Sequence, residues 1–220
     1  MSRQHLTDAT RAALVEAAIH EFAAHGFDAA STRAIAARAG VHQPQINYHF
    51  ESKSELWRAA VDHLFDELDT ELAGALGGDV DDASGFEDTI RAFVRHAARR
   101  PELNRIMVKE SSIESERLAW MVERHIRHRF DAVSASWDAL RAHGAVIDVD
   151  AVTAFYMLLG AGTLLYTNAP EARLLTGVDP LEPSAVDAHA DAMARLLFVH
   201  EPAAAVRAHR PSRPTTRSTR

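Results

Sequence analysis

The segment from residue 31 to residue 57 constrains the fold most, because it reads as two short helices, a tight turn and the start of a longer helix. Ser31 is a good N-cap, since its hydroxyl can accept a hydrogen bond from a free backbone N–H of the first turn. Gly40 stands where a helix ends in a left-handed residue, which glycine adopts at little steric cost. Ser52 and Glu55 form a capping box for the third helix. The segment therefore predicts a helix-turn-helix followed by a long helix.

Apolar side chains in the same segment give each short helix one inward face. Ile35 and Ala39 lie on one side of the first helix, and Ile46 and Phe50 share a face of the second. Pro44 is tolerated near the start of the second helix, where its missing N–H would have no partner anyway. The outward residues of the second helix are polar or aromatic: Gln43, Gln45, Asn47, Tyr48 and His49.

These residues resemble the DNA-binding helix-turn-helix of the TetR family of transcriptional regulators. The family pattern near the end of the recognition helix is an apolar residue, aromatic or His residues and then a Lys. This chain has Ile-Asn-Tyr-His-Phe at 46–50, followed by Lys53. It departs from the pattern at Asn47, where the family usually carries Tyr, and at His42, where Ser is common. The resemblance covers about 30 of 220 residues.

The residues and the resemblance together predict a set of DNA contacts. Gln43 can pair bidentately with adenine, and Arg33 with guanine if it reaches the major groove. The resemblance supports both as base readers and adds Pro44 and Gln45 as groove contacts. It also implies phosphate contacts from four residues: Thr32, Tyr48, His49 and Lys53. The alternative is a three-helix bundle whose polar face is only solvated.

Charge is unevenly distributed along the chain. The formal net charge is −7. Residues 1–60 hold six basic and six acidic residues, residues 61–200 thirteen basic and twenty-four acidic, and residues 201–220 five Arg and one Glu. Repulsion between DNA and the acidic body would orient the neutral N-terminal end toward phosphate. The alternative is that the acidic surface only aids solubility.

Cysteine is absent, which excludes disulfides, thiolate metal sites and thiol chemistry and suits a reducing cytoplasm. The N-terminus has no apolar stretch of the signal-peptide type. We therefore expect a cytoplasmic protein.

The rest of the chain predicts a helical domain. One amphipathic helix is expected over residues 118–140, and residues 151–167 carry no charge. A helix that is apolar all round is buried on both sides, and in a chain of this size we expect the second side to meet another subunit. Gly160 and Gly162 would let a partner backbone approach closely. A loop is expected at Pro170 and over residues 177–183. A final amphipathic helix follows, and the resemblance implies that it and the 151–167 helix form a four-helix dimer interface.

A set of large side chains could line a pocket in this domain, apolar with a few polar tips. The candidates are Met107, Trp120, Met121, His125, Phe130, Trp137, Phe155 and Tyr156. Each of them taken alone is equally suited to an ordinary core. The resemblance favours a pocket, because the family commonly keeps its inducer cavity in the middle of this domain.

Two other interpretations are weaker. His125 and His128 lie three apart on one helix, but two histidines do not make a metal site without further ligands, so we expect no metal. Ser111, His125 and Asp131 suggest a hydrolase, yet no nucleophile elbow accompanies them. We therefore expect neither an enzyme nor a cofactor.

The expected fold is all-α, with a helix-turn-helix domain over 1–55, a ligand-binding and dimerisation domain over 56–200 and a disordered basic tail over 201–220. The expected function is a TetR-like repressor that binds a palindromic DNA operator as a homodimer and is released by a small, mostly apolar ligand. One alternative is an activator or a ligand-independent regulator of the same fold. Another is a ligand carrier or enzyme that borrows the fold.

Overall fold

The computed structural model describes residues 3–75 and 83–199, and this part of the chain is helical without a β-strand. The predicted all-α fold is confirmed. The α-helices run α1 (Arg3–Ala29), α2 (Thr32–Arg38), α3 (Pro44–His49), α4 (Lys53–Ala75), α5 (Ala83–Arg99), α6 (Pro101–Ser111), α7 (Glu116–Met121), α8 (Arg127–Ala142), α9 (Ala151–Thr167), α10 (Ala169–Thr176) and α11 (Pro183–Leu197). A π-helix, η1 (Val122–Ile126), joins α7 to α8.

The first hydrophobic core lies among the N-terminal helices. Its centre is formed by fully buried side chains of α1, α2 and α4, such as Ile19, Ile35 and Trp57. Ile106 of α6 and Met121 of α7 complete it from the C-terminal half of the chain. The N-terminal helices are therefore packed directly against α6 and α7.

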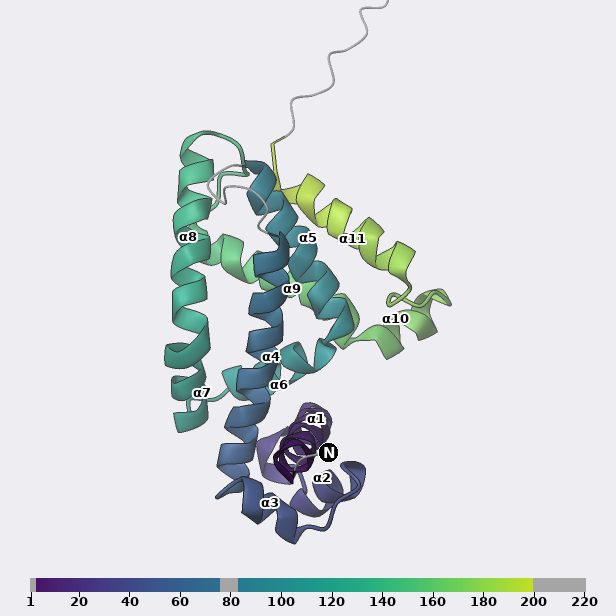
Figure 1. The fold of residues 1–220 in the computed structure, drawn as a ribbon. Helices are drawn as coiled ribbons and strands as arrows, with labels where there is room; N and C mark the ends of the chain where they lie inside the picture. The colour runs from purple at the N-terminus through teal and green to yellow at the C-terminus, as the bar shows by residue number, and fades with distance from the viewer. Residues whose placement is uncertain (1–2, 76–82, 200–220) are drawn as a thin grey trace, which may run out of the picture.

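Helix α4 connects the two halves of the molecule. In Figure 1 it rises from the group of α1, α2 and α3 and runs beside α5 in the upper half. Its first turn is capped by Ser52, whose Oγ accepts a hydrogen bond from the Glu55 N–H at 3.1 Å. Helix α4 thus follows the helix-turn-helix directly and also packs against α5 in the C-terminal half of the chain.

The second core lies among α5, α8, α9 and α11. Trp137 is fully buried there and donates its indole N–H to the Val149 carbonyl at 2.9 Å. Tyr166 is also buried, with its hydroxyl 2.8 Å from His189 Nδ1, and burial raises the pKa of Tyr166 to about 12. An isolated antiparallel β-bridge between Val146 and Phe198 ties the loop after α8 to the end of α11.

The structure differs from two local predictions. Residues 118–140, expected as one helix, are helical throughout, but the π-helix η1, in which one extra residue widens a turn, lies between α7 and α8. Pro170, expected in a loop, lies in the first turn of α10, which ends at the left-handed Gly177. Proline at a helix start and glycine after its end are the usual helix boundaries.

Helix α9 is buried on one side only within a single chain. Ala154, Leu158 and Tyr166 face the core, whereas Tyr156 is 67% exposed and Leu164 56% exposed. An exposed apolar stripe on a helix with a buried opposite face marks an interaction surface.

The two glycines of α9 lie in different environments. A Cβ at Gly160 would meet no atom within 4 Å, so this position is open. A Cβ at Gly162 would lie 2.9 Å from Cε1 of Phe93 on α5 of the same chain. The expectation that both glycines face a partner was therefore wrong for Gly162, which admits α5 instead.

We retain the division into domains at 1–55 and 56–200 as a proposal, and the tail over 201–220 lies outside the described residues. No helix within 3–75 and 83–199 is long and apolar enough to cross a membrane.

Candidate nucleic-acid interface

The helix-turn-helix is built as the sequence predicts. Ser31 Oγ accepts a hydrogen bond from the Ala34 N–H at 3.3 Å, and Gly40 has a φ of 69° in the turn after α2. Ile46 and Phe50 are buried, so α3 is fixed by its inward face. The opposite face of α3 is consequently free to meet a partner.

The eight predicted DNA-contact residues lie on α2, on α3 and at the start of α4. Five are exposed: Arg33, Gln43, Pro44, Gln45 and Tyr48. Three are half-buried: Thr32, His49 and Lys53. Tyr48 is 77% exposed, although aromatic side chains of this size are usually well covered. The structure therefore presents a polar and aromatic surface on an ordered scaffold.

Two hydrogen bonds fix the start of α3. The Gln43 side chain donates from Nε2 to Thr32 Oγ1 at 3.4 Å, which joins the starts of α2 and α3. Gln45 Oε1 accepts from the backbone N–H of His42 at 3.0 Å and so caps the turn before α3. Both glutamines are oriented before any partner binds.

Lys53 is held by its own domain. Its Nζ donates to the Asp28 carbonyl at 3.2 Å and lies 4.9 Å from the centroid of the Phe27 ring. The guanidinium of Arg117, on α7, lies 4.1 Å from the centroid of the same ring. Phe27 thus joins a predicted phosphate contact to the C-terminal half. Sequence reasoning did not find Arg117, because 64 residues separate it from Lys53 and no local pattern links them.

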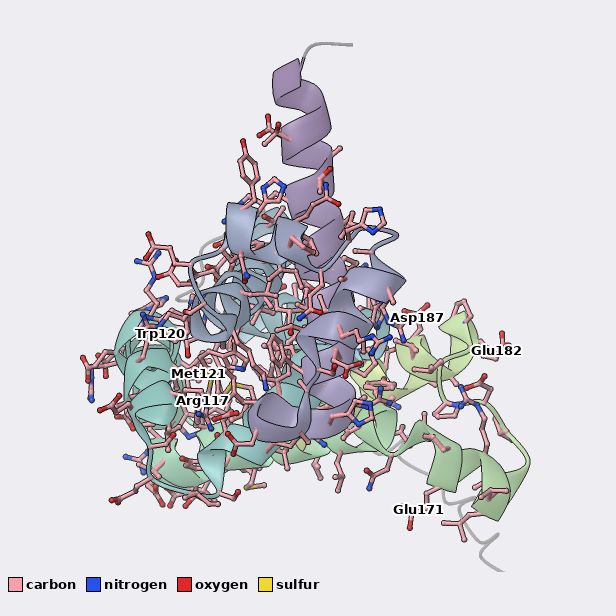
Figure 2. The ribbon with its side chains drawn as sticks, turned by 90° about the horizontal axis from the view of Figure 1, so that it is seen from below. Arg117, Trp120, Met121, Glu171, Glu182 and Asp187 are labelled. Carbon is pink, nitrogen blue, oxygen red and sulfur yellow. The ribbon has the colours of Figure 1, made fainter. Side chains whose placement is uncertain are left out.

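The eight predicted ligand-pocket residues do not lie in one place. Trp120, Met121 and His125 lie against the first core, while Met107 packs on its edge. Figure 2 shows Trp120 and Met121 together on α7, on the opposite side of the molecule from α10 and the start of α11.

The other candidates lie among α8 and α9. Phe130 and Phe155 meet edge to face with centroids 5.2 Å apart, and Tyr156 lies next to Phe155 at 5.7 Å. Trp137 belongs to the second core. A pocket lined by all eight at once is not formed in this conformation of the described residues.

His125 is the buried polar member of this set. Its ring stacks on Phe65 of α4 with centroids 4.4 Å apart, and its Nε2 lies 2.8 Å from Asp62 Oδ1. Burial lowers the pKa of His125, although the nearby Asp62 carboxylate opposes this effect. The π-helix places His125 where it fastens α4 to the C-terminal half. No hydrogen bond joins Ser111, His125 and Asp131 in the part of the chain described.

Two clefts flank α4. One, of about 910 Å³, lies between α1, the end of α3, α4 and α7, and Arg11, Arg58 and Trp120 are among its lining residues. The other, of about 1050 Å³, lies between α4 and α5 and is lined on the α5 side by Arg95 and His96, among others. Of the predicted pocket residues, only Trp120 lines either cleft. Within residues 3–75 and 83–199, no group of three or more His, Asp or Glu could hold a metal ion.

Comparison with known proteins relates the N-terminal segment of the chain to bacterial regulators. Residues 14–60 match the family model described as "Bacterial regulatory proteins, tetR family". The HTH-type transcriptional repressor SCO4008 of Streptomyces coelicolor is 34% identical over 103 residues, which are 47% of this chain and 50% of that protein. The HTH-type transcriptional activator FasR of Mycolicibacterium smegmatis is 35% identical over 86 residues, 39% of each chain. The chain thus spans half or less of the length of these curated relatives.

Solved structures share the fold over most of the chain. AibR in complex with isovaleryl coenzyme A and operator DNA aligns with a TM-score of 0.70 at 18% identity, covering 86% of this chain and 98% of AibR. A TetR family transcription regulator from Marinobacter aquaeolei aligns with a TM-score of 0.63 at 20% identity, covering 90% and 100%.

An N-terminal helix-turn-helix with an exposed second helix, carried on a long helix that enters a helical body, defines a helix-turn-helix protein of the two-part, all-α type. The helix-turn-helix of this chain, residues 14–60, matches the TetR family of regulatory proteins, and the chain shares its fold with a solved regulator of that family.

Proposed function

We propose that the protein regulates transcription by binding a palindromic DNA operator as a homodimer, and that it acts as a repressor released by a small, mostly apolar ligand. The observation that carries this proposal is the exposed surface of α2 and α3. Polar and aromatic side chains project there from helices that Ile35, Ile46 and Phe50 fix from beneath. A surface of this kind suits the major groove, which admits an α-helix.

The contacts divide into two roles. Gln43 and Arg33 are exposed and carry groups that match base edges, with Pro44 and Gln45 beside them in the groove. Thr32, Tyr48, His49 and Lys53 then fix the register on phosphates, which carries no direct sequence information. The acidic body, with its excess of Asp and Glu over residues 61–200, disfavours binding of DNA anywhere else.

Dimerisation is proposed to use α9 and α11. Val152, Tyr156, Gly160 and Leu164 follow one another at four-residue spacing on α9 and are all exposed. Leu196 adds an exposed apolar side chain on α11, at 60% exposure. A two-fold pairing of these faces would place two α3 helices in successive major grooves, about 34–36 Å apart.

The ligand is proposed to bind among the candidate residues of the C-terminal half. Phe130, Phe155 and Tyr156 form a ring cluster between α8 and α9, and Tyr156 also belongs to the proposed dimer face. The relative AibR was solved with isovaleryl coenzyme A, which supports a small-molecule effector for this fold. To release the operator, a ligand must bind the conformation in which the two helix-turn-helix domains no longer fit the DNA more tightly than the DNA-binding conformation, by a few kcal/mol. Equally tight binding to both conformations would not change their populations.

An activator is the second candidate, because one of the two curated relatives is an activator and the other a repressor. Reporter expression from the operator in a strain lacking the protein separates the two. Expression rises without a repressor and falls without an activator. A response to no small molecule at all would favour a ligand-independent regulator.

The DNA-binding proposal is tested by selection from a random double-stranded DNA pool, followed by sequencing, at a stated salt concentration. We expect an enriched palindrome whose half-sites repeat at the spacing of about one helical turn. Folded, ligand-stripped dimer that enriches no sequence would contradict the proposal and favour a ligand carrier that borrows the fold.

A further inference from the structure

The two glutamines of the recognition surface use opposite ends of their amides within the protein. A glutamine side chain has a carbonyl oxygen that accepts hydrogen bonds and an amino group that donates two. Gln45 uses its oxygen and Gln43 its nitrogen. The groups that remain for a partner therefore differ between the two residues.

The orientation of Gln45 follows from its partner. The backbone N–H of His42 can only donate, so the Gln45 atom 3.0 Å away must be the oxygen. With the oxygen turned toward this N–H, the amino group lies on the other side of the amide carbon. Gln45 is exposed, and its Nε2 has no hydrogen-bond partner among the described residues. It thus presents two donors to the outside.

Gln43 retains a mixed pair of groups. Its Nε2 lies 3.4 Å from Thr32 Oγ1 and uses one N–H there. The second side-chain N–H and the side-chain oxygen Oε1 have no hydrogen-bond partner in the part of the chain that the structure describes. Gln43 thus presents one donor and one acceptor to a partner.

Base edges in the major groove distinguish these two patterns. Adenine offers N7 as an acceptor and N6 as a donor, which matches one donor beside one acceptor. Guanine offers two acceptors, N7 and O6, which Lys reads from a single nitrogen with only donors. An amide that presents only its amino group resembles Lys in this respect.

We propose that Gln45 reads guanine as a donor-only side chain, that Gln43 reads adenine, and that Thr32 positions Gln43 for this task. The inference rests on the proposed DNA-binding function and specifies its operator. Each half-site contains an adenine set by Gln43 and a guanine set by Gln45. Thr32 acts on base choice through Gln43, in addition to its proposed phosphate contact.

The first test compares DNA selections by the wild-type protein and by Gln45→Glu. The carboxylate keeps an acceptor for the His42 N–H, so the cap of α3 is retained, but it removes both donors. Preference for guanine at one half-site position should fall on the order of tenfold, and cytosine should gain there, because a carboxylate accepts from cytosine N4. Gln45→Met serves as the matched control, since it loses cap and donors together. Thermal unfolding of both variants shows whether a lost base preference comes from unfolding or from the lost base contact.

The second test concerns Thr32. Thr32→Val keeps the shape but removes Oγ1, whereas Thr32→Ser keeps the hydroxyl. The measurement is the ratio of affinities for operators with and without the Gln43 adenine. A positioning role predicts that this ratio falls several-fold in Thr32→Val and is rescued in Thr32→Ser. A phosphate contact alone would weaken both operators equally and would overturn the positioning role.

The outcomes separate this inference from the proposed function. An enriched palindrome with adenine at both positions, or with a guanine that Gln45→Glu leaves unchanged, would overturn the assignment while the regulator stands. The assignment is supported by an enriched palindrome in which Gln45→Glu changes the preference at the guanine position and Thr32→Val lowers the preference at the adenine position. Absence of any enriched sequence would overturn both, because no operator would exist to be read.

Discussion

Arg100 holds Glu16 through both terminal nitrogens of its guanidinium, at 2.8 and 3.0 Å from the two carboxylate oxygens. Arg100 precedes α6 and Glu16 lies on α1, so the pair joins the C-terminal half to the N-terminal helices. Arg100 Nε also lies 2.6 Å from Glu67 Oε2 on α4. The guanidinium of Arg100 therefore joins α1, α4 and the start of α6, although Glu16 and Arg100 are 84 residues apart in the sequence.

Substitution Arg100→Met should lower the free energy of unfolding by about 1 to 2 kcal/mol, because hydrogen bonds to charged groups contribute about 1.5 to 3 kcal/mol and solvent screening at the partly exposed Glu16 reduces this. The Arg100 hydrogen bonds lower the pKa of Glu16. The stabilisation is therefore present above the unfolded carboxylate pKa and is lost as pH falls through the lowered folded pKa. Urea unfolding of the wild type and of Arg100→Met should converge in acid. Arg95→Met, which removes an exposed pair with Asp187, is the control and should cost less. Equal costs for the two variants would contradict the special role of Arg100.

The burial of His96 predicts a second pH dependence of the stability, at higher pH than that of Glu16. His96 is 2% exposed, and burial lowers its pKa, as does the nearby charge of Arg100, while Glu67 opposes them. The unfolded chain then binds more protons, so stability should fall as pH drops from about 6.5 toward the folded pKa. His96→Met should flatten this fall, whereas the exposed-site control His128→Gln should not. Denaturant midpoints at pH 7.5 and 5.5 measure the effect, and an unchanged slope in His96→Met would exclude His96 as its source.

Gly162→Ala should destabilise the protein. The added methyl would lie 2.9 Å from the Phe93 ring, and overpacking of this kind costs about 1 to 3 kcal/mol. Gly74→Ala is the matched control, since its Cβ meets no atom within 4 Å. It should leave stability unchanged or raise it by up to about 1 kcal/mol through helix propensity. Thermal unfolding of the two variants checks both signs, and a stabilised Gly162→Ala would show that α5 and α9 are not packed this closely.

The double substitution Tyr156→Glu with Leu164→Glu should produce monomers. Two carboxylates in the middle of a proposed apolar interface would each be desolvated without a partner. Light scattering should give the 24.2 kDa of one chain instead of twice that mass. Ile113→Glu changes another apolar side chain, 71% exposed, outside α9 and should leave the dimer intact. A double variant that remains dimeric would move the interface elsewhere.

The parts of the fold that depend on local chemistry could be predicted from sequence. The Ser31 cap, the left-handed Gly40 and the bounds of α9 follow from side chains within a few residues of each position. The helical nature of the C-terminal half follows from its amphipathic patterns, and the two-part architecture follows from the family resemblance. Local capping and the family resemblance therefore account for the correct predictions of helix bounds and of the architecture.

The parts that depend on tertiary contacts could not be predicted. The π-helix before α8 sets His125 against Phe65 and Asp62 of a distant helix. Gly162 was assigned to a partner because nothing in the sequence shows Phe93 beside it. The candidate pocket residues were grouped by type, but their positions depend on three-dimensional packing, which places Trp137 and Trp120 in different cores.

The central claim is that the surface of α2 and α3 binds the operator. Its most direct test is the affinity of the folded dimer for its selected operator, by fluorescence anisotropy at several salt concentrations, before and after combined substitution of Gln43, Tyr48 and Lys53 by Ala. We predict a loss of affinity of at least about 100-fold and a shallower salt dependence, because base and phosphate contacts are removed together. Unchanged affinity and salt dependence in a folded, dimeric triple variant would contradict the account.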